Sequence, residues 1–561
     1  MNNSLSTKDY LVFVIYFLIV SIYGYWIYQR KKKTSTDTKD FFLAEGSLTW
    51  WAIGASLIAS NISAEQFIGM SGNGFTMGLA ISTYEWMAAA TLIVVAVFFI
   101  PVYLKNKIYT MPQFLNQRYN GTVAMIMAVF WLLLYVVVNL TSILFLGALA
   151  ISSISGISLT ACMLFLAVFA IIITLGGMKV IGYTDVVQVF FLILGGLVTT
   201  YLALNLVATH FGSSGVVSGF KLLTKNADEH FHMIFEKGNP NYLSLPGLSV
   251  LIGGMWIVNL NYWGCNQYIT QRALGADLKT ARSGILFAAF LKLLMPVIVV
   301  LPGIAAFVLF ENGYFQQEMM VNGEMMPDKA YPVLLNLLPS GLKGLAFAAL
   351  TAAVVASLAG KANSISTIFT LDIYKKKINP LASEKKLVWT GRLAVILSML
   401  LAVIIAPFLG IDKKGGFEYI QEYTGFVSPG IFAMFILGFF WKKTTSNAAL
   451  FATVGGFGLS IFFKVLPSFA NLEWLSPYGF SKLVDQKDGH SVFEIPFIDR
   501  MFFVFAISVV GMYIISMYEN KRGVKTHGLE IDRKMFVTTP GFAAGALLVL
   551  GILVALYSLF W

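Results

Sequence analysis

The chain has 561 residues, of which 57% are hydrophobic and 12% are charged, and its formal net charge is +11. Soluble domains carry about 25% charged residues, so a mean hydropathy of +0.76 excludes both a globular aqueous domain and a disordered chain. Apolar runs of membrane-spanning length recur along the whole sequence, which predicts an all-α polytopic membrane protein in the lipid bilayer. Cytoplasmic loops account for the excess of basic residues, so nucleic acid is not expected as a partner.

Fourteen apolar segments are expected to cross the membrane. In chain order they are 9–28, 48–73, 77–104, 121–151, 158–178, 183–208, 247–271, 280–311, 343–377, 386–410, 416–440, 446–466, 497–518 and 539–560. The basic residues between them gather on one side, which we expect to be cytoplasmic. An even number of spans then predicts that both termini lie outside, in a cell (inner or plasma) membrane.

Two of these segments are interrupted by polar residues. The stretch 58-IASNISAEQFIGMSG-72 carries five polar side chains between Ser60 and Gln66, and 259-NLNYWGCNQY-268 repeats the pattern five spans later. Interrupted helices at matching places in two halves indicate an inverted repeat with a binding site at the membrane midplane.

The interruptions divide the chain into expected parts. These are a peripheral first helix with its cytoplasmic loop at 1–47, a five-helix repeat at 48–208, an extracellular loop at 209–246, a second five-helix repeat at 247–440 and three peripheral helices at 441–561.

Polar side chains within the predicted spans are candidates for one ligand site. They are Gln66, Glu85, Asn259, Lys292 and Gln421. The aromatic residues Tyr84, Tyr262, Trp263 and Phe417 are candidates for its flat faces. This set suits a polyhydroxylated neutral ligand, because each hydroxyl both donates and accepts a hydrogen bond. Two simpler interpretations remain: the amides hydrogen-bond neighbouring helices, and Glu85 and Lys292 neutralise each other.

Seven stretches of the sequence resemble one family. They are 54-GASLIASNISAEQFIGMSGNGF-75, 84-YEWM-87, 135-YVVVNLTSILFLG-147, 176-GGMKVIGYTDVVQVFF-191, 256-WIVNLNYWGCNQYITQR-272, 366-STIFTLDIYK-375 and 419-YIQEYTGFVSPGIFAMFILGFFWKKTTS-446. The chain is similar along nearly its whole length to the solute–sodium symporters, particularly those that carry galactose or glucose. The resemblance implies a LeuT-like 5+5 inverted repeat with about fourteen helices, alternating access and Na+ as the coupling ion.

The resemblance also implies a role for each matching residue. Gln66, Glu85, Asn259, Lys292 and Gln421 match the polar sugar ligands, Tyr262 matches the inner-gate aromatic with Trp263 beside it, and Met70, Tyr84 and Phe417 match the outer gate. Ala59, Ile62 and Ala353 match the positions whose carbonyls hold sodium, Ser357 adds a hydroxyl, and Asp185 matches the acidic residue on the ion's exit path.

The chain departs from the family pattern in three respects. Ala356 stands where a second hydroxyl is usual beside Ser357, so one sodium ligand is missing. Ala88 and Glu418 replace a serine and a glutamine, and Asn261 replaces an aromatic beside the inner gate. The first departure leaves the strength of sodium coupling open, and the second leaves open which sugar is carried.

Lys361 lies four residues after Ser357, one turn further along the same helix face. We expect its ammonium to approach Asp185 and to tune ion release or, in the extreme, to replace the ion. A structurally paired or snorkelling lysine is the alternative.

The sequence therefore predicts a sodium-coupled importer of a monosaccharide. Its expected partners are a small sugar, sodium and lipid, with no obligate protein partner. Sodium- or proton-coupled transport of myo-inositol, another polyol or a sialic acid is an alternative, and so is a weakly coupled sugar sensor or conductor. An enzyme is not expected, because the sequence has no Walker loop, HExxH or GxSxG motif.

Overall fold

The computed structural model describes residues 5–31, 48–175, 178–321, 323–408, 416–485 and 490–561. The chain forms two compact units, each assembled from segments that are distant in sequence. The first unit comprises Met1–Glu85, Trp131–His232 and Gln271–Ile420, and the second comprises Trp86–Phe130, Met233–Thr270 and Gln421–Trp561. Parts of the predicted segments 1–47 and 386–410 lie outside the described residues.

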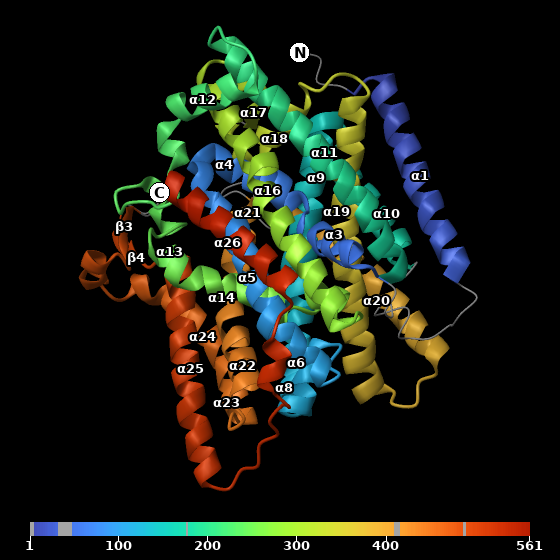
Figure 1. Cartoon of the computed structure of the whole chain (residues 1–561), viewed down its shortest axis with the longest axis vertical. Coiled ribbons are helices and arrows are strands. Elements are labelled where there is room, and N and C mark those ends of the chain that lie inside the picture. The colour runs from blue at the N-terminus through green and yellow to red at the C-terminus, as the bar shows by residue number, and fades with distance from the viewer. Residues whose placement is uncertain (1–4, 32–47, 176–177, 322, 409–415, 486–489) are drawn as a thin grey trace. The chain divides into compact units, whose positions relative to one another are not determined.

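Long apolar helices make up most of the first unit (Figure 1). Its main helices are α1 (Thr7–Lys31), α3 (Trp50–Asn61), α4 (Ser71–Met77), α9 (Thr141–Ser155), α10 (Leu159–Leu175), α11 (Met178–His210), α12 (Val216–Asn226), α16 (Leu278–Glu311), α18 (Ala330–Leu335), α19 (Leu342–Thr367) and α20 (Glu384–Ile405). Shorter or tighter pieces are η1 (Glu65–Met70), η2 (Gly78–Ser82), η4 (Leu134–Leu140), η5 (Asp228–Phe231), α17 (Gln316–Met319), η7 (Pro327–Lys329), η8 (Ile368–Ile378), η9 (Ala406–Phe408) and the strands β1 (Met320–Val321) and β2 (Glu324–Met325), which pair antiparallel.

Helix α16 packs closely against both α3 and α4. The crossing with α3 is close because both helices carry glycine there: a Cβ on Gly54 would lie 2.7 Å from the Gly284 carbonyl oxygen. At the crossing with α4, a Cβ on Gly303 would lie 2.2 Å from the Ser71 carbonyl oxygen. Small residues let membrane helices approach backbone to backbone, so these contacts fix both pieces of the interrupted segment against the same helix.

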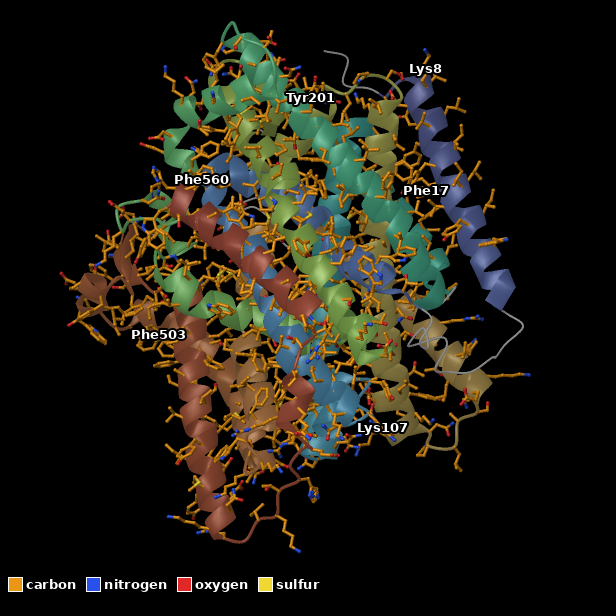
Figure 2. All side chains as sticks on the ribbon, viewed as in Figure 1. Lys8, Phe17, Lys107, Tyr201, Phe503 and Phe560 are labelled. Carbon is orange, nitrogen blue, oxygen red and sulfur yellow. The ribbon has the colours of Figure 1, made fainter. Side chains whose placement is uncertain are left out.

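Helix α19 is held at its start by α1. Asp9 Oδ1 accepts hydrogen bonds from Gly341 N at 2.7 Å and Gly344 N at 3.0 Å, which satisfies amides that a helix N-terminus leaves without partners. Further along, Tyr16 and Phe17 pack with Ala348 in a buried apolar cluster, and Phe17 is labelled in Figure 2. Cap and cluster together position α19, the helix that carries three of the predicted ion-site residues.

Some helices continue from one unit into the other. Counting every crossing, four helices contain a unit boundary: α5 (Thr83–Val94), α8 (Gly121–Leu133), α15 (Gln267–Leu274) and α21 (Gly416–Gly425). The remaining elements of the second unit are η3 (Val95–Phe99), α6 (Ile100–Lys105), α7 (Met111–Arg118), η6 (Pro240–Leu243), α13 (Ser249–Ile252), α14 (Gly254–Cys265), α22 (Ser428–Phe440), α23 (Ser446–Leu450), η11 (Phe451–Gly455), α24 (Gly456–Val465), η12 (Leu466–Ser468), η13 (Glu473–Tyr478), β3 (Lys482–Asp485), β4 (Ser491–Glu494), α25 (Phe497–Lys521), η14 (Arg533–Phe536) and α26 (Pro540–Leu559).

Within the second unit, α22 packs against both α14 and α25. Its C-terminal carbonyls are satisfied by Arg118, whose buried guanidinium donates to the carbonyls of Gly438 (2.7 Å), Thr444 (3.1 Å) and Trp441 (2.8 Å). Strands β3 and β4 form an antiparallel hairpin in the loop before α25. A guanidinium that fills the end of a helix in this way stabilises the oxygens that the last turn leaves without donors.

The helix count differs from the prediction. Among the described residues, nine helical segments are long and apolar enough to cross a membrane, or ten if the bent pair Phe417–Gly425 and Ser428–Phe440 is one span. All fourteen predicted segments contain helix. However, several are divided by breaks or are short, such as α3 and α14 with 12 residues each, so fourteen spans stay a prediction.

Candidate functional site

The polar stretch at 58–72 contains a break in a buried helix. Helix α3 ends at Asn61, and the next residue, Ile62, has extended backbone angles of φ −73° and ψ 107°. Helical structure resumes in η1 at Glu65. Because the last carbonyls of a helix have no intrahelical donors, the break bares main-chain oxygens among buried residues. The interruption that the polar residues predicted is confirmed.

Ser63 and Gln66 cap the helix that follows the break. The Ser63 hydroxyl accepts a hydrogen bond from Glu65 N at 3.2 Å. In return, Gln66 Oε1 accepts from Ser63 N at 3.0 Å and from the Ser63 hydroxyl at 3.3 Å. This pair is similar to a capping box, in which a serine and a glutamine three residues apart bond reciprocally, but Ser63 accepts from the amide two residues on. Part of the polar cluster therefore supports the break itself.

Lys292 of α16 forms a buried ion pair with Glu85 of α5. Its Nζ lies 2.5 Å from Glu85 Oε2, and the two side chains are 1% and 4% exposed. The same ammonium donates to Oδ1 of Asn61, the last residue of α3. The predicted sugar ligands Lys292 and Glu85 thus contact each other, and Lys292 is also hydrogen-bonded to the end of the broken helix. The mutual neutralisation that the sequence left open is present, and it places charged hydrogen-bonding groups at the break.

A second buried lysine approaches the break from α19. Lys361 Nζ lies 3.6 Å from Glu65 Oε1, and the side chains are 5% and 10% exposed. Asp185, the partner expected for Lys361, lies on α11, but its side chain is outside the described residues. The described partner is Glu65, which sequence reasoning did not consider.

The four residues predicted to hold sodium come from the break and from α19. Ala59 and Ile62 lie at the end of α3, Ala353 and Ser357 lie on α19, and all four are buried. The Ser357 hydroxyl donates to the Ser60 carbonyl at 3.4 Å, so the two elements meet at this point. Main-chain carbonyls and one hydroxyl are hard oxygen ligands, and this donor set fits sodium.

The residues predicted to form the outer gate are buried together. Met70 ends η1, and the rings of Tyr84 and Phe417 lie 5.0 Å apart, edge to face at 89°. Gly69 is pressed against Phe417, because a Cβ on Gly69 would lie 2.8 Å from the Phe417 amide nitrogen. The residues predicted to form the gate therefore pack directly on the helix that follows the break.

The remaining predicted ligands belong to the second unit. Asn259, Tyr262 and Trp263 lie on α14, before a second break at Asn266, whose backbone is extended (φ −102°, ψ 121°). Asn259 Nδ2 donates to the Met255 carbonyl of its own helix at 3.2 Å, and the Tyr262 and Trp263 rings lie 5.1 Å apart. The second predicted interruption is thus present, but Asn259 itself lies in continuous helix.

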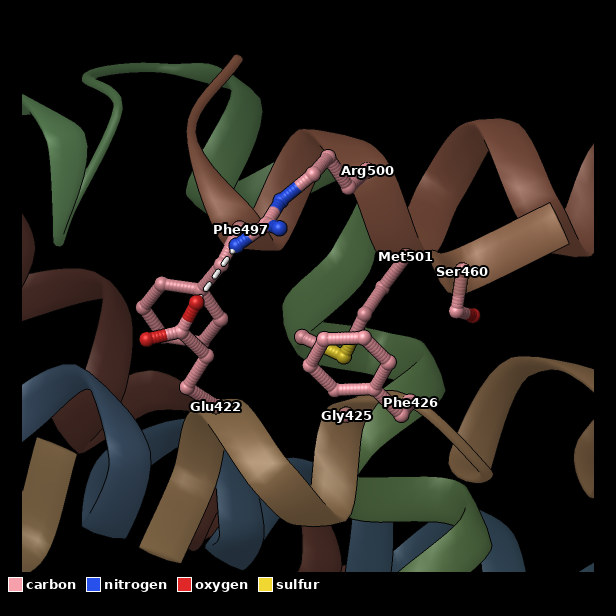
Figure 3. Close-up of a pocket in the computed structure, with 7 residues that line it drawn as sticks. All are labelled: Glu422, Gly425, Phe426, Ser460, Phe497, Arg500 and Met501. Atoms are coloured by element: carbon pink, nitrogen blue, oxygen red, sulfur yellow. Dashed lines mark hydrogen bonds and ion pairs between the residues drawn. The ribbon is translucent and has the colours of Figure 1, made fainter. Parts of the chain in front are cut away.

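Gln421 lies on α21, next to a cluster of charges in the second unit. Its neighbour Glu422 accepts from Arg500 of α25 at 2.9 Å and from Lys464 of α24 at 2.6 Å. Figure 3 shows Glu422 and Arg500 pointing toward one another at a small pocket, which is lined by Glu422, Gly425, Phe426, Ser460, Phe497, Arg500 and Met501. These ion pairs tie the helix that carries Gln421 to α24 and α25.

A family model described as the sodium:solute symporter family matches residues 41–456. The chain belongs to the sodium:solute symporter family. It is 45% identical to the sodium/glucose cotransporter of Vibrio parahaemolyticus over all of this chain and 99% of that protein. It is 34% identical to the human sodium/myo-inositol cotransporter 2, over 82% of this chain and 70% of that protein.

A solved structure of a Na+-coupled sialic acid symporter, in a substrate-bound outward-open state, matches 91% of this chain and 98% of its own, with a TM-score of 0.73 and 21% identity. At that identity the likeness establishes the fold, and it confirms the predicted LeuT-like class. The chain is therefore a multi-pass membrane transporter with sodium as its coupling ion.

Two residues at the candidate site were not predicted from the sequence. Asn61 was noted only as part of the polar cluster, and Glu65 was given no role, yet each is bound by a buried lysine from another helix. The available signal was the cost of an ionisable group within a span, which marks every such residue as one that needs a partner. That argument applies to Glu65 as it does to Glu85.

Proposed function

We propose that this symporter imports a monosaccharide such as galactose or glucose by alternating access, driven by the inward sodium gradient. The observation that carries the proposal is the buried group of Lys292, Glu85 and Asn61 beside the break in α3. The identity of 45% to a sodium/glucose cotransporter along the whole chain supports it.

The proposed sugar ligands are Gln66, Glu85 and Lys292 in the first unit and Asn259, Gln421, Tyr262 and Trp263 in the second. Amides and charged groups can both donate to and accept from hydroxyls, and aromatic faces cover the apolar face of a sugar ring. This chemistry favours a neutral polyhydroxylated solute over an amino acid, which needs a compact ion-pairing site.

In the proposed cycle, sodium binds to the carbonyls of Ala59, Ile62 and Ala353 and to the Ser357 hydroxyl, and so joins the broken helix to α19. Sugar binding then closes Met70, Tyr84 and Phe417 above the site. Opening on the Tyr262 side releases sodium past Asp185 and Lys361, and the sugar follows. Coupling requires that sodium and sugar each raise the affinity for the other by the same factor.

The same proposal includes the arrangement in the membrane. Segments 48–208 and 247–440 would be the inverted repeats, flanked by 1–47, the 209–246 loop and 441–561. Both termini would be extracytoplasmic in an inner or plasma membrane, because the basic loops gather on the other side. The protein would be no enzyme and would need no protein partner.

The test is uptake into proteoliposomes with a panel of labelled galactose, glucose, myo-inositol and sialic acid. A sodium, potassium or proton gradient is supplied in turn. We expect galactose or glucose to accumulate above its external concentration with the sodium gradient only. Flux that merely equilibrates the sugar would instead indicate a weakly coupled conductor or sensor, and accumulation with a proton gradient would overturn the sodium mechanism.

Myo-inositol is the second candidate substrate. The identity of 34% to the human sodium/myo-inositol cotransporter 2 favours it, and Ala88 and Glu418 leave the hydroxyl pattern of the ligand open. Accumulation of myo-inositol without galactose or glucose in the same panel would select this alternative.

A further inference from the structure

Two residues of α19, the proposed sodium ligand Ser357 and Lys361, both contact the broken segment. Ser357 donates to the Ser60 carbonyl before the break at 3.4 Å, and Lys361, one turn further, pairs with Glu65 after the break at 3.6 Å. The break therefore lies between a contact that offers oxygens and a contact that carries two full charges. The proposed sugar site does not require the contact between Lys361 and Glu65.

Both charges are fixed near the ion. Lys361 lies four residues after Ser357, about one helical turn from that proposed sodium ligand, and Glu65 lies three residues after Ile62, where helical structure resumes after the break. Both side chains are at least nine-tenths buried, so solvent screens their charges much less than it would at a surface. A buried pair of this kind is poor evidence for added stability, because desolvation offsets the attraction.

We propose that Lys361 and Glu65 are a pair of positioning residues that sets sodium affinity at the break: Lys361 weakens sodium binding and Glu65 strengthens it. The inference rests on the proposed sodium position. Within this pair, the Lys361 ammonium repels sodium and promotes its release. The Glu65 carboxylate attracts sodium, so that the site still binds the ion. Ala356, which offers no side-chain oxygen beside Ser357, leaves affinity more dependent on these charges.

The proposal predicts effects of opposite sign for the two single substitutions. With Lys361→Met, the remaining carboxylate attracts sodium, and the dissociation constant should fall on the order of tenfold. With Glu65→Gln, the remaining ammonium repels sodium, and the constant should rise by a similar factor. The double variant Glu65→Gln/Lys361→Met should return to within about threefold of the unmodified protein, because both charges are absent.

The experiment measures binding of labelled sodium to the purified full-length protein at pH 8, with potassium used to keep the ionic strength constant. Thermal unfolding with and without sodium is a second readout, because a ligand that binds the folded state raises the unfolding temperature. Lys376→Met and Asp372→Asn are matched controls. Lys376 and Asp372 form an ion pair of 2.6 Å in η8, and Lys376 lies about fifteen residues after Lys361 in the sequence. Neither control should change sodium affinity.

A purely structural pair would give a different result. Both single variants would then lose stability, and sodium affinity would stay unchanged or shift in the same direction in both, which would overturn the proposal. If Lys361→Met does not fold, Glu65→Gln and the double variant still decide the question, because the second substitution must restore affinity. Absence of any sodium-dependent signal in the unmodified protein would instead overturn the proposed sodium position itself.

Discussion

Lys292 and Glu85 form an ion pair 2.5 Å long within the membrane-spanning part of the first unit. The pair is also attached to Asn61, where α3 breaks. Such a pair does not need to add stability overall, because well-packed apolar residues often replace a buried ion pair without loss. Its presence is better explained by the solute that the proposed function brings to it.

Removing the charges of Lys292 and Glu85 separately and together distinguishes their effect on stability from their effect on sugar uptake. Lys292→Met and Glu85→Gln should each destabilise the protein by about 3–5 kcal/mol, because each leaves one buried charge unpaired. The double variant should recover most of that stability, and all three should lose sugar uptake. Thermal unfolding in detergent and proteoliposome uptake measure the two effects. Lys105→Met, which breaks an exposed pair with Glu530, should cost less than about 1 kcal/mol. A double variant that is as unstable as the singles would contradict this account.

The hydrogen-bonded pair of Ser63 and Gln66 gives Gln66 two separable roles. Ser63→Ala removes the hydroxyl that accepts from Glu65 N, and it should lower stability by about 1 kcal/mol while sugar affinity stays nearly unchanged. Gln66→Ala removes the acceptor for Ser63 N and, in addition, a proposed sugar ligand. It should therefore lower both stability and sugar affinity, the latter about tenfold or more. Equal sugar affinities in the two variants would show that Gln66 only caps the helix.

Asn259 and Asn261 lie two residues apart on α14 and should behave differently. Asn259 is bonded to the Met255 carbonyl of its own helix, whereas Asn261 donates to the Ser428 hydroxyl of α22 at 3.1 Å. Asn259→Ala should therefore weaken sugar uptake and leave the unfolding temperature nearly unchanged. Asn261→Ala should cost stability of about 1 kcal/mol through the lost contact between helices. Wild-type uptake kinetics in Asn259→Ala would remove it from the proposed site.

The sequence predicted what depends on local composition. Polar side chains are costly in lipid, so the five between Ser60 and Gln66 cannot face it. This cost indicated the break that the structure shows at Ile62. The pairing of Glu85 with Lys292 was one interpretation of the sequence, because an unpaired charge within a membrane span is costly. Local composition could not give the register between helices, so the contact of Lys361 with Glu65 was missed.

The bend in the span that contains Gln421 was missed for a different reason. The helices Phe417–Gly425 and Ser428–Phe440 meet at 53°, although 416–440 reads as one apolar segment. The signal was present in Pro429, which lies in the first turn of α22 and is favourable at a helix start. The charge cluster of Glu422 could not be predicted from this segment, because its partners Lys464 and Arg500 lie on later helices.

His230 should make stability depend on pH. His230 lies in η5, outside the predicted spans. Its ring stacks on Phe307 with centroids 4.0 Å apart, and Nε2 lies 3.1 Å from the Phe75 carbonyl oxygen. Burial lowers the pKa of His230 below its usual value, against the opposing effect of the carbonyl. The folded state therefore binds fewer protons than the unfolded state, and stability should fall as pH drops below about 6.5.

The unfolding temperature, measured between pH 7.5 and pH 5, tests this dependence. It should fall less steeply in His230→Gln than in the unmodified protein, because glutamine takes up no proton in this range. His527→Gln, at an exposed position, is the control and should keep the original slope. Identical slopes in all three proteins would show that burial of His230 has no such effect.

Gly69 should be essential because Phe417, in the proposed outer gate, leaves no room for a side chain there. An added Cβ would lie 2.8 Å from the Phe417 amide nitrogen and 2.9 Å from Phe417 Cβ, and backbone cannot move aside as a flexible side chain can. Gly69→Ala should therefore push Phe417 away from Tyr84, and uptake should fall about tenfold or more even where the protein still folds. Gly458→Ala is the matched control, because Gly458 lies in helix α24 with open space around it and alanine is the better helix former. Uptake by both variants, together with the rate at which sugar leaks from preloaded proteoliposomes, measures the effect. Normal uptake in Gly69→Ala would mean that closure of the gate does not require the contact between η1 and Phe417.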